Sequence, residues 1–400
     1  MRPYLANRMA RLGTETAFAV SQDATKFEAQ GNQVYPFHLG DIDIPTPKNI
    51  IDAAHQAMVD GKTGYDPSAG IMPLRELLAI TIGIDRGVSY GPENVAIQPG
   101  GKPVISKFLE IVMNPGESVL YPNPGFPIYE SQINYLGGKA VPYSYEPNDT
   151  GFEIKRDSLE KSIDNSTRAI IYNNYQNPLG AESSPEEMEW LAEICLKHDL
   201  MVLSDEAYYH ILYSGQPQSI VSLPGMQERT IILQTFSKTY AMTGWRLGAA
   251  IGPAMFIDQI AKLNVNIESC TNHFIQYAGI EALSGDQSGA LAILHTLRSR
   301  RDCLFQELST IHGVSVSNPN STFYLFPDIT EIFKKSGAPS LEKFRLDTLS
   351  NTGVAFCTRE HFGSLQAEEN RFSLRFAFSG IPETRIKQGL ALLRNYWENL

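Results

Sequence analysis

Cysteine is scarce in this 400-residue sequence, and its spacing does not match a metal-binding motif. The four cysteines, Cys195, Cys270, Cys303 and Cys357, lie far apart, with no Cys-x-x-Cys pair. This spacing excludes a disulfide framework and the common zinc motifs, so we expect no metal and a reducing compartment. No stretch approaches the ~20 apolar residues of a membrane-spanning helix, and the first twenty residues lack the apolar core of an export signal. We expect a cytoplasmic protein.

Positive charge is also in short supply. The sequence has 33 Lys and Arg against 44 Asp and Glu, a formal net charge of −11, and no block of basic residues. Such a balance argues against a nucleic-acid partner or an anionic membrane surface. We therefore expect small molecules as partners.

Several catalytic fingerprints are absent as well. The sequence has no G-x-G-x-x-G, no H-E-x-x-H and no G-x-S-x-G. Gly61-Lys62-Thr63 looks like the end of a P-loop, but Gln56 stands where that motif requires glycine. These absences disfavour a dinucleotide, zinc-protease, serine-hydrolase or P-loop site.

What the sequence does contain is a regular alternation of short apolar runs with helical patterns. The runs read as strands that are apolar on both faces, as in a parallel sheet covered by helices on both sides. They span residues 119–121, 169–172, 200–204, 230–233 and 249–251. We predict an α/β fold with a large, doubly wound, mostly parallel sheet.

One helix can be predicted in detail. Ser184 suits the N-cap, Pro185 suits the first helical position, and Glu187 would complete a capping box. The helix should end near residues 198–199 and lead into the strand at 200–203, whose carboxyl end carries Asp205. In open α/β sheets that end of a strand is where ligands bind.

The last hundred residues differ in character. An arginine-rich helical stretch around 298–301 is followed by strand-like pieces at 323–326, 354–356 and 372–378. We predict a large α/β domain over 46–295. Residues 1–45, too short to bury a core alone, should join 296–400 in a smaller α+β domain.

Residues suited to a phosphorylated cofactor follow the predicted strands. Small residues at 99–101 open a helical stretch at 103–113, and free N–H groups at a helix start attract phosphate. The loop at 235–248 combines the hydroxyls of Thr235 and Ser237 with Lys238 and Arg246. Hydroxyls and a guanidinium suit a phosphate dianion, and a lysine close to another cation suits Schiff-base chemistry.

Two further groups suit a planar, protonated ring. Asp205 at a strand end could keep a pyridine nitrogen protonated so that the ring withdraws electrons. Asn177, in the amide-rich stretch 173–180, and Tyr208 could hold a phenolic oxygen.

At this point the chain resembles the class I/II aminotransferases, pyridoxal 5′-phosphate (PLP) enzymes of fold type I, and looks closest to the aspartate aminotransferase branch. The most specific part is Ser237-Lys238 followed eight residues later by Arg246 within Met-Thr-Gly-Trp-Arg-Leu-Gly. The stretch 64–70, Asn177-Pro178 and Asp205-Glu206-Ala207-Tyr208 come in the family's order. The resemblance implies a ping-pong transfer of an amino group between an amino acid and a 2-oxo acid.

The resemblance also implies roles for individual residues. Lys238 would form the Schiff base and move the proton between substrate and cofactor, with Asp205 at the ring nitrogen and Asn177 and Tyr208 at the phenolic oxygen. The implied phosphate ligands are Gly100, Gly101, Lys102, Thr235, Ser237 and Arg246, joined by Tyr65 from the partner subunit of a homodimer. Phe126 would stack on the ring. The implied substrate ligands are Arg375 at the α-carboxylate, Gly40 and Asn177 beside it, and Lys102 at the distal carboxylate of an aspartate- or glutamate-like substrate.

Some assignments stay open. Arg371, on the same face of the expected strand, competes with Arg375 for the carboxylate, and Lys102 is equally well read as a solvated residue at a helix start. Glu268 lies in a segment where the family is small and hydroxyl-rich, which leaves the substrate side chain undecided. A PLP-dependent lyase or synthase acting at the β- or γ-carbon is the alternative function. A non-catalytic aminotransferase-like domain and a nicotinamide dehydrogenase are less well supported.

Overall fold

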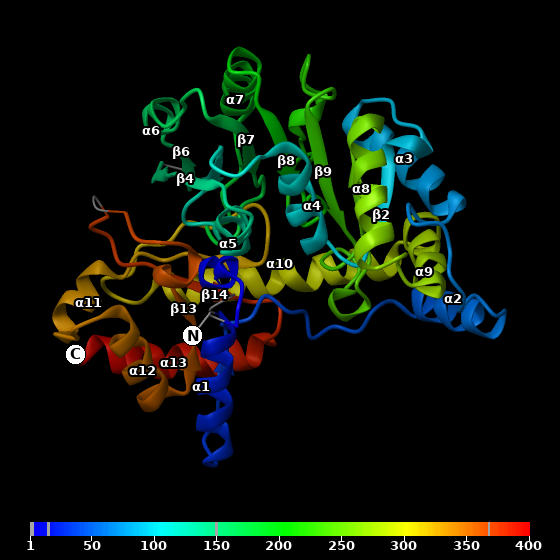
Figure 1. The fold of residues 1–400 in the computed structure, drawn as a ribbon. Coiled ribbons are helices and arrows are strands. Elements are labelled where there is room, and N and C mark those ends of the chain that lie inside the picture. The colour runs from blue at the N-terminus through cyan, green and yellow to red at the C-terminus, as the bar shows by residue number, and fades with distance from the viewer. Residues whose placement is uncertain (1–3, 14–16, 149–150, 367–368) are drawn as a thin grey trace.

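A seven-stranded sheet forms the centre of the molecule (Figure 1). The computed structural model describes residues 4–13, 17–148, 151–366 and 369–400. The strand order is β2-β10-β9-β8-β7-β3-β4. Its strands are β2 (Val95–Gln98), β3 (Ser118–Pro122), β4 (Lys139–Tyr143), β7 (Thr167–Tyr172), β8 (Met201–Asp205), β9 (Thr230–Thr235) and β10 (Gly248–Ile251).

The sheet is mostly parallel, as predicted. The pairs β3–β4, β3–β7, β7–β8 and β8–β9 are parallel, whereas β10 runs antiparallel to both β2 and β9. All five predicted apolar runs are strands of this sheet, and β2 and β4 were not among them. Because β10 runs in the reverse direction, it begins beside the carboxyl ends of the parallel strands.

Helices cover both faces of the sheet, which confirms the doubly wound architecture. The helices around it are α2 (Lys48–Val59), α3 (Met72–Arg86), α4 (Lys102–Val112), α5 (Ile128–Tyr135), α6 (Arg156–Lys161), α7 (Pro185–Lys197), α8 (Ala254–Ile267) and α9 (His273–Ser284). Apolar side chains of α4, α5 and α8 form one buried cluster with the sheet. Those of α2, α3 and α9 form a second cluster, and those of α7 a third. The central strands are buried on both sides, as their continuous apolar sequence requires.

The amino end of α7 shows both a correct and a wrong local prediction. The Ser184 hydroxyl accepts the N–H of Glu187 at 3.1 Å, so the N-cap is confirmed. The capping box is wrong, because Glu187 Oε1 instead accepts the N–H of Ile154 at 2.5 Å. The N–H of Ile154, in a hairpin 33 residues away, takes the place of the Ser184 N–H that a capping box would use.

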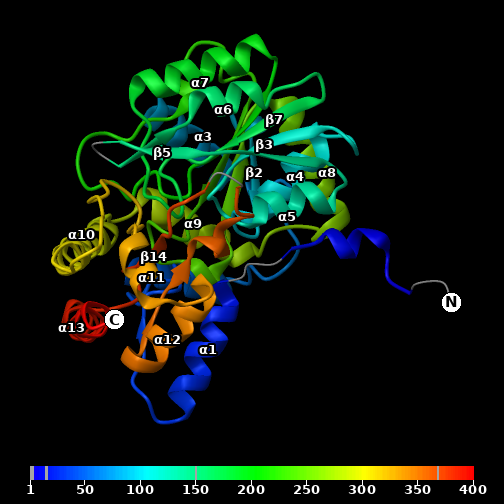
Figure 2. The ribbon, with the colours of Figure 1, turned by 90° about the vertical axis from the view of Figure 1, so that its left-hand side faces the viewer.

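Most of the remaining helices and strands lie below the sheet in Figures 1 and 2. It contains α1 (Ala17–Ala29), α10 (Ser288–Ser309), α11 (Thr330–Ser336), α12 (Leu341–Thr352) and α13 (Glu383–Glu398), with the strands β1 (Tyr35–Pro36), β11 (Tyr324–Leu325), β12 (Val354–Ala355), β13 (Cys357–Thr358) and β14 (Leu374–Ala377). A separate hairpin joins β5 (Tyr145–Pro147) to β6 (Phe152–Ile154). Short 3-10 turns are η1 (Asn7–Arg11), η2 (Pro92–Asn94), η3 (Ile220–Ser222), η4 (Thr243–Trp245) and η5 (Arg359–Phe362).

Segments from the first and last parts of the sequence lie side by side in this lower part. Strand β1 pairs in parallel with β12, with Tyr35 opposite Val354, and Arg345 of α12 forms an ion pair with Asp23 of α1 at 2.6 Å. Residues of α1 and β1 therefore pack with the last hundred residues, whereas Arg11 and Gly13 contact α5 beside the central sheet. Strand order there is β11-β14-β13, and the buried cluster around it includes side chains of α10 and α13. In the described ranges, no helix is both long and apolar enough to cross a membrane.

Candidate active site

A cavity of about 200 Å³ opens where the parallel strands of the central sheet end. Twelve of the residues singled out from the sequence line it. They are Gly40, Gly101, Lys102, Phe126, Asn177, Asp205, Tyr208, Thr235, Ser237, Lys238, Arg246 and Arg375. Gly100 adjoins this lining, and Tyr65 does not contribute to it. Segments that are far apart in the sequence thus converge on one site.

One end of the cavity is built to receive an anion. Helix α4 begins at Lys102, and its N-cap residue, Gly101, has no side chain to cap the free N–H groups. The hydroxyls of Thr235 and Ser237 lie 2.9 Å apart on the neighbouring strand end. Backbone N–H groups, a helix dipole and two hydroxyls are the kinds of donor that could hold a phosphate.

The guanidinium of Arg246 completes this end. Its Nη1 donates to the carbonyl of Thr243 at 2.7 Å, and within the described chain Arg246 forms no ion pair with a carboxylate. Gly100 has φ +97°, and a Cβ there would collide with the Arg246 guanidinium. The turn needs glycine both for its backbone conformation and for the space that Arg246 occupies.

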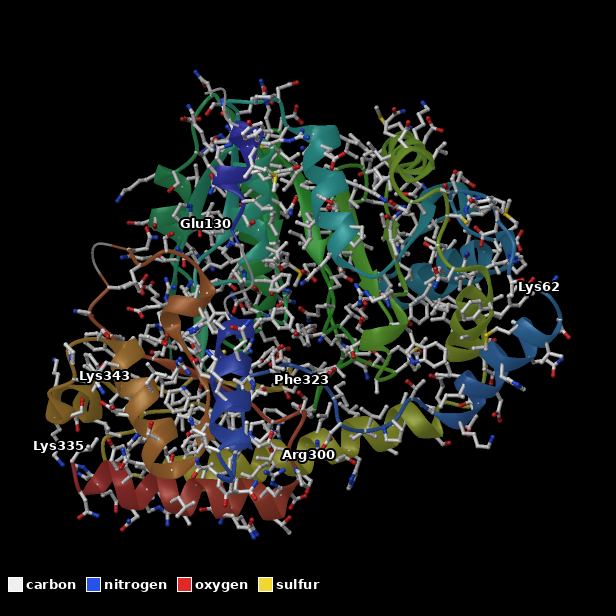
Figure 3. All side chains as sticks on the ribbon, turned by 60° about the horizontal axis from the view of Figure 1, so that its bottom comes forward. Lys62, Glu130, Arg300, Phe323, Lys335 and Lys343 are labelled. Carbon is white, nitrogen blue, oxygen red and sulfur yellow. The ribbon has the colours of Figure 1, made fainter. Side chains whose placement is uncertain are left out.

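Lys238 points into the middle of the cavity. Its Nζ donates to the carbonyl of Gly40 at 3.0 Å and lies 5.3 Å from the ring centroid of Phe323. Phe323 is labelled near the centre of the molecule in Figure 3. The amine is therefore held between the end of the central sheet and the lower part of the chain.

Asp205 is the last residue of β8 and is only 6% exposed. Its Oδ2 accepts the hydroxyl of Tyr129 at 2.6 Å, and its Oδ1 accepts the N–H of Ala207 at 3.2 Å. Burial raises the pKa of this carboxyl, while the Tyr129 hydrogen bond and the charge of Lys238 lower it. Asp205 is thus a buried carboxylate whose charge depends on a few specific neighbours.

Tyr208 and Asn177 lie on the side of the cavity that faces the lower strands. The hydroxyl of Tyr208 lies 2.7 Å from that of Tyr324, and burial together with Tyr324 raises the pKa of Tyr208 well above its usual range. Tyr208 is therefore a neutral hydroxyl at physiological pH. Asn173 fixes the Asn177 segment, because its Oδ1 accepts the N–H of Asn177 at 3.0 Å and its Nδ2 donates to the Asp205 carbonyl at 2.9 Å.

Arg375 on β14 is 4% exposed and lies between two aromatic rings. Its Nη1 donates to Asn177 Oδ1 at 3.0 Å and its Nη2 to the carbonyl of His38 at 2.7 Å. The buried Nε has no hydrogen-bond partner among the described residues. A fixed guanidinium with donors to spare suits a carboxylate.

Arg371, the competing candidate, is placed differently. It precedes β14, so the expected shared strand face does not exist. Its side chain is 58% exposed and lies 3.9 Å from Asp328, outside the cavity. Of the two arginines, only Arg375 reaches the site.

Glu268 also lies apart from the cavity. It forms an ion pair with the buried Lys107 of α4, whose Nζ also donates to Asn264 Oδ1 at 2.7 Å and Gln98 Oε1 at 2.8 Å. Burial lowers the pKa of Lys107, and the Glu268 carboxylate opposes that shift. The unusual carboxylate in this segment is explained by a buried cation and has no contact with the site of the same chain.

Tyr65 is 90% exposed. In a single copy of the chain it is not among the residues that line the cavity. Any role at the cofactor phosphate would require a second copy.

The residues in the cavity fit PLP. The uncapped helix start, two hydroxyls and Arg246 suit its phosphate, and the buried Asp205 suits its ring nitrogen. Lys238 and the Phe126 ring line the same cavity. The fit rests on the chemistry of the donors and on the glycine turn that makes room for Arg246.

The sequence reasoning gave no role to several lining residues, among them Tyr129, Tyr324, His361 and Phe362, and it placed Asn173 only within the amide-rich stretch. Tyr129 follows Phe126 by three positions at the start of α5, and the two rings touch edge to face at 5.7 Å. An i, i+3 search from Phe126 would have found it. No local signal marks Tyr324, which lies on a short strand far along the chain.

Comparison with known proteins gives a consistent result. A family model described as "Aminotransferase class I and II" matches residues 33–393. The chain is 32% identical to an aspartate aminotransferase of Bacillus sp. (strain YM-2), over 91% of this chain and 93% of the relative. It is 31% identical to a probable aspartate/prephenate aminotransferase of Aquifex aeolicus over the full length of both.

Solved structures are similar over nearly the whole chain. The aspartate aminotransferase of Thermus thermophilus, solved with maleate, superposes with a TM-score of 0.88 at 28% identity, covering 99% of this chain and all of the other. An alanine aminotransferase of Pyrococcus furiosus superposes with a TM-score of 0.90 at 26% identity, again covering 99% of this chain and all of the other.

Proposed function

The chain belongs to the class I and II aminotransferases, which makes it a PLP-dependent enzyme of amino-group transfer, and we propose that its donor is a dicarboxylic amino acid such as aspartate or glutamate. The amino group would pass to a 2-oxo acid in two half-reactions of a ping-pong cycle. The observation that carries the residue assignment is the convergence of Lys238, Asp205 and Arg375 on one cavity. The relatives and structures named above are all aminotransferases and give no support to a lyase or synthase.

PLP supplies a carbonyl carbon for the amino group and an electron-withdrawing ring. In our proposal Gly100, Gly101, Thr235, Ser237 and Arg246 bind its phosphate through N–H, hydroxyl and guanidinium donors. Phe126 packs on the ring. Arg246 matters most among these ligands because it supplies a full charge that no carboxylate of the described chain neutralises.

The proton transfers are assigned to Lys238. Its Nζ would carry the cofactor in the resting enzyme and, once released, would take the proton from the substrate Cα and deliver it to the cofactor carbon. The Gly40 carbonyl, 3.0 Å from Nζ, gives the freed amine a hydrogen-bond acceptor within the site. A proton shuttle of this kind needs such a fixed position.

Asp205 and Tyr208 would hold protons at two other atoms. The Asp205 carboxylate would retain the proton on the ring nitrogen, and the neutral hydroxyl of Tyr208 would donate to the phenolic oxygen beside Asn177. Arg375 would orient the substrate by pairing with its α-carboxylate. Their burial supports these roles because electrostatic contacts are stronger away from water.

The proposed substrate class depends on Lys102. This residue begins α4 and lines the cavity, with its Nζ 5.4 Å from the centroid of the Phe126 ring. An ammonium group there suits a second carboxylate at the far end of the substrate. The names of the relatives and the maleate, a dicarboxylate, in the Thermus thermophilus structure are in keeping with this proposal.

We further propose that the enzyme is a cytoplasmic homodimer in which the partner subunit's Tyr65 reaches the phosphate. The 90% exposure of Tyr65 in one chain supports this, because it leaves the side chain available to a partner subunit. We also propose residues 46–295 as the larger domain and 1–45 with 296–400 as the smaller one. Sedimentation tests the dimer, and a fully active monomer would refute it.

The substrate proposal is tested by mixing the PLP-loaded enzyme with one amino acid at a time, without any 2-oxo acid. L-aspartate and L-glutamate should each convert the yellow form of the enzyme to the pyridoxamine form and release one keto acid per site. L-alanine should react at least ~10-fold more slowly, since one lost charged contact costs about that much. Equal rates for all three would overturn the dicarboxylate assignment but leave amino-group transfer in place.

The role of Lys238 is tested separately. Borohydride reduction of the loaded enzyme followed by peptide mass spectrometry should find the reduced cofactor on Lys238. Lys238→Ala should abolish turnover, whereas Lys262→Ala, at an exposed lysine of α8, should not. Cofactor on another lysine, or normal turnover by Lys238→Ala, would overturn the assignment.

A further inference from the structure

Tyr129 forms a direct side-chain hydrogen bond with the Asp205 carboxylate. Its side chain is fully buried at the start of α5, and its hydroxyl donates to Asp205 Oδ2 at 2.6 Å. That separation is typical of a hydroxyl bound to an ionised carboxylate. Burial and the Asp205 charge raise the pKa of Tyr129 well above its usual range, so the phenol stays a donor at physiological pH.

Two other hydrogen bonds of Asp205 each have a backbone group on one side. Its Oδ1 accepts the N–H of Ala207, and its own carbonyl accepts from Asn173. Tyr129 is therefore the one side chain of the described residues that hydrogen-bonds this carboxylate. Changing Tyr129 to phenylalanine removes a single donor and leaves the strand end intact.

We propose that Tyr129 is a positioning residue that keeps Asp205 ionised and oriented, and so sets how strongly the ring nitrogen of the bound cofactor holds its proton. This rests on the proposed role of Asp205 as the partner of that nitrogen. Tyr129 would touch neither substrate nor cofactor nitrogen itself and would act through the carboxylate.

The physical argument is a balance of charge and burial. A buried carboxyl favours its neutral form unless donors compensate for the lost water. The charged or titratable groups around Asp205 are Tyr129 on α5, Glu206 beside it and Lys238 after β9, and those around Tyr129 also include Tyr143 and Tyr208. Without the Tyr129 hydroxyl, the proton shared with the ring nitrogen shifts toward Asp205, and the ring loses its charge.

The aromatic ring of Tyr129 has a second contact that a conservative change preserves. It packs edge to face on Phe126, with centroids 5.7 Å apart and planes at 84°. Phenylalanine at position 129 keeps this packing, so the cofactor-stacking ring should not move. A change seen in Tyr129→Phe is then attributable to the hydroxyl.

The chain offers a matched control in Tyr143. It is equally buried, and its hydroxyl donates to the Ile171 carbonyl at 2.9 Å, away from the cavity lining. Tyr143→Phe removes a buried hydroxyl from a backbone carbonyl and leaves Asp205 unchanged. Asp205→Asn serves as the reference for complete loss of the carboxylate.

The experiment loads each enzyme with PLP labelled with ¹⁵N in the ring and follows the ring resonance by NMR across pH. We expect Asp205→Asn to give the shift of a neutral ring, and Tyr129→Phe to lower the proton affinity of the nitrogen by about tenfold, as loss of one charge-assisted hydrogen bond does. Tyr143→Phe should match the wild type. Fluorinated tyrosine at position 129, a stronger donor, should change the affinity in the opposite direction.

Two results would overturn the proposal in distinguishable ways. If Asp205→Asn moves the resonance but Tyr129→Phe and the fluorinated enzyme match the wild type, Tyr129 has only a structural role. If Asp205→Asn leaves the resonance unchanged, the assignment of Asp205 fails and the role of Tyr129 fails with it.

Discussion

The guanidinium of Arg375 donates to Asn177 Oδ1 across 3.0 Å, which joins the expected substrate anchor to an expected cofactor ligand. Arg375 lies on β14 in the lower part, and Asn177 follows β7 at the carboxyl end of the central sheet. This charge-assisted hydrogen bond connects the two halves of the active site, as do those from Lys238 to the Gly40 carbonyl and between Tyr208 and Tyr324.

Replacing Arg375 by lysine should therefore damage catalysis severely. Lysine has no planar fork, so it cannot bind a carboxylate through two parallel bonds while also holding Asn177 and the His38 carbonyl. We expect kcat/KM to fall on the order of 10²-fold or more, mainly through KM. Arg371→Lys is the control, because that side chain lies outside the cavity. Similar losses in both variants would count against Arg375 as the carboxylate ligand.

Gly100→Ala should weaken cofactor binding. The residue has φ +97°, and the added methyl group would collide with Arg246. Forcing a non-glycine residue into that conformation costs about 1–3 kcal/mol, and the displaced guanidinium adds to it. The dissociation constant of PLP should rise at least tenfold. Gly244→Ala, in the loop that carries Arg246, has open space around its Cβ and should bind PLP as the wild type does.

Glu268→Gln should lower stability and leave substrate choice intact. It removes the carboxylate that neutralises the buried Lys107, so the free energy of unfolding should fall by about 3 kcal/mol. Asp258→Asn, which breaks the exposed pair with Lys262 on the same helix, should cost less than about 0.5 kcal/mol. Urea titration measures both. A changed preference among amino donors in Glu268→Gln would mean that this carboxylate acts on the substrate after all.

Acid should destabilise the fold through His38. Burial, reinforced by the charges of Arg375 and Arg345, lowers the pKa of His38 from 6.5 to about 4. Between these two values the unfolded chain binds a proton that the folded chain excludes. The resulting stability is complete above pH 6.5 and is lost as pH falls to 4, about 3 kcal/mol in all.

The pH test uses His38→Gln. Its free energy of unfolding should depend less on pH between 4 and 6.5 than that of the wild type, and the two curves should run parallel above that window. His198→Gln, which removes an exposed imidazole, is the control. Parallel curves for His38→Gln and the wild type through the whole range would contradict the prediction.

Local sequence was sufficient for the parts of the fold that depend on local rules. Apolar runs predicted five strands of the central sheet, and Ser184 predicted the start of α7. Because ligands gather where parallel strands end, the residues after these runs also included part of the cavity lining, such as Asn177, Asp205 and Lys238.

Features that depend on distant partners escaped prediction. Glu187 binds a backbone N–H 33 residues away, and Glu268 pairs with a lysine 161 residues away. The direction of β10 and the start of β14, which separates Arg371 from Arg375, are set by strand pairing. None of these partners has a signature in a short window of sequence.

The antiparallel course of β10 also explains why the distance from Lys238 to Arg246 is a reliable signature. Gly248 at the start of β10 pairs with Thr235 at the end of β9, so the chain leaves and re-enters the sheet at the same point. The intervening residues form a loop whose two ends are held together by the pairing of β9 with β10. The loop has no spare length, so an inserted or deleted residue would rotate either the lysine or the arginine out of the site. The spacing of Lys238 and Arg246 in the sequence is therefore set by the closure of this loop.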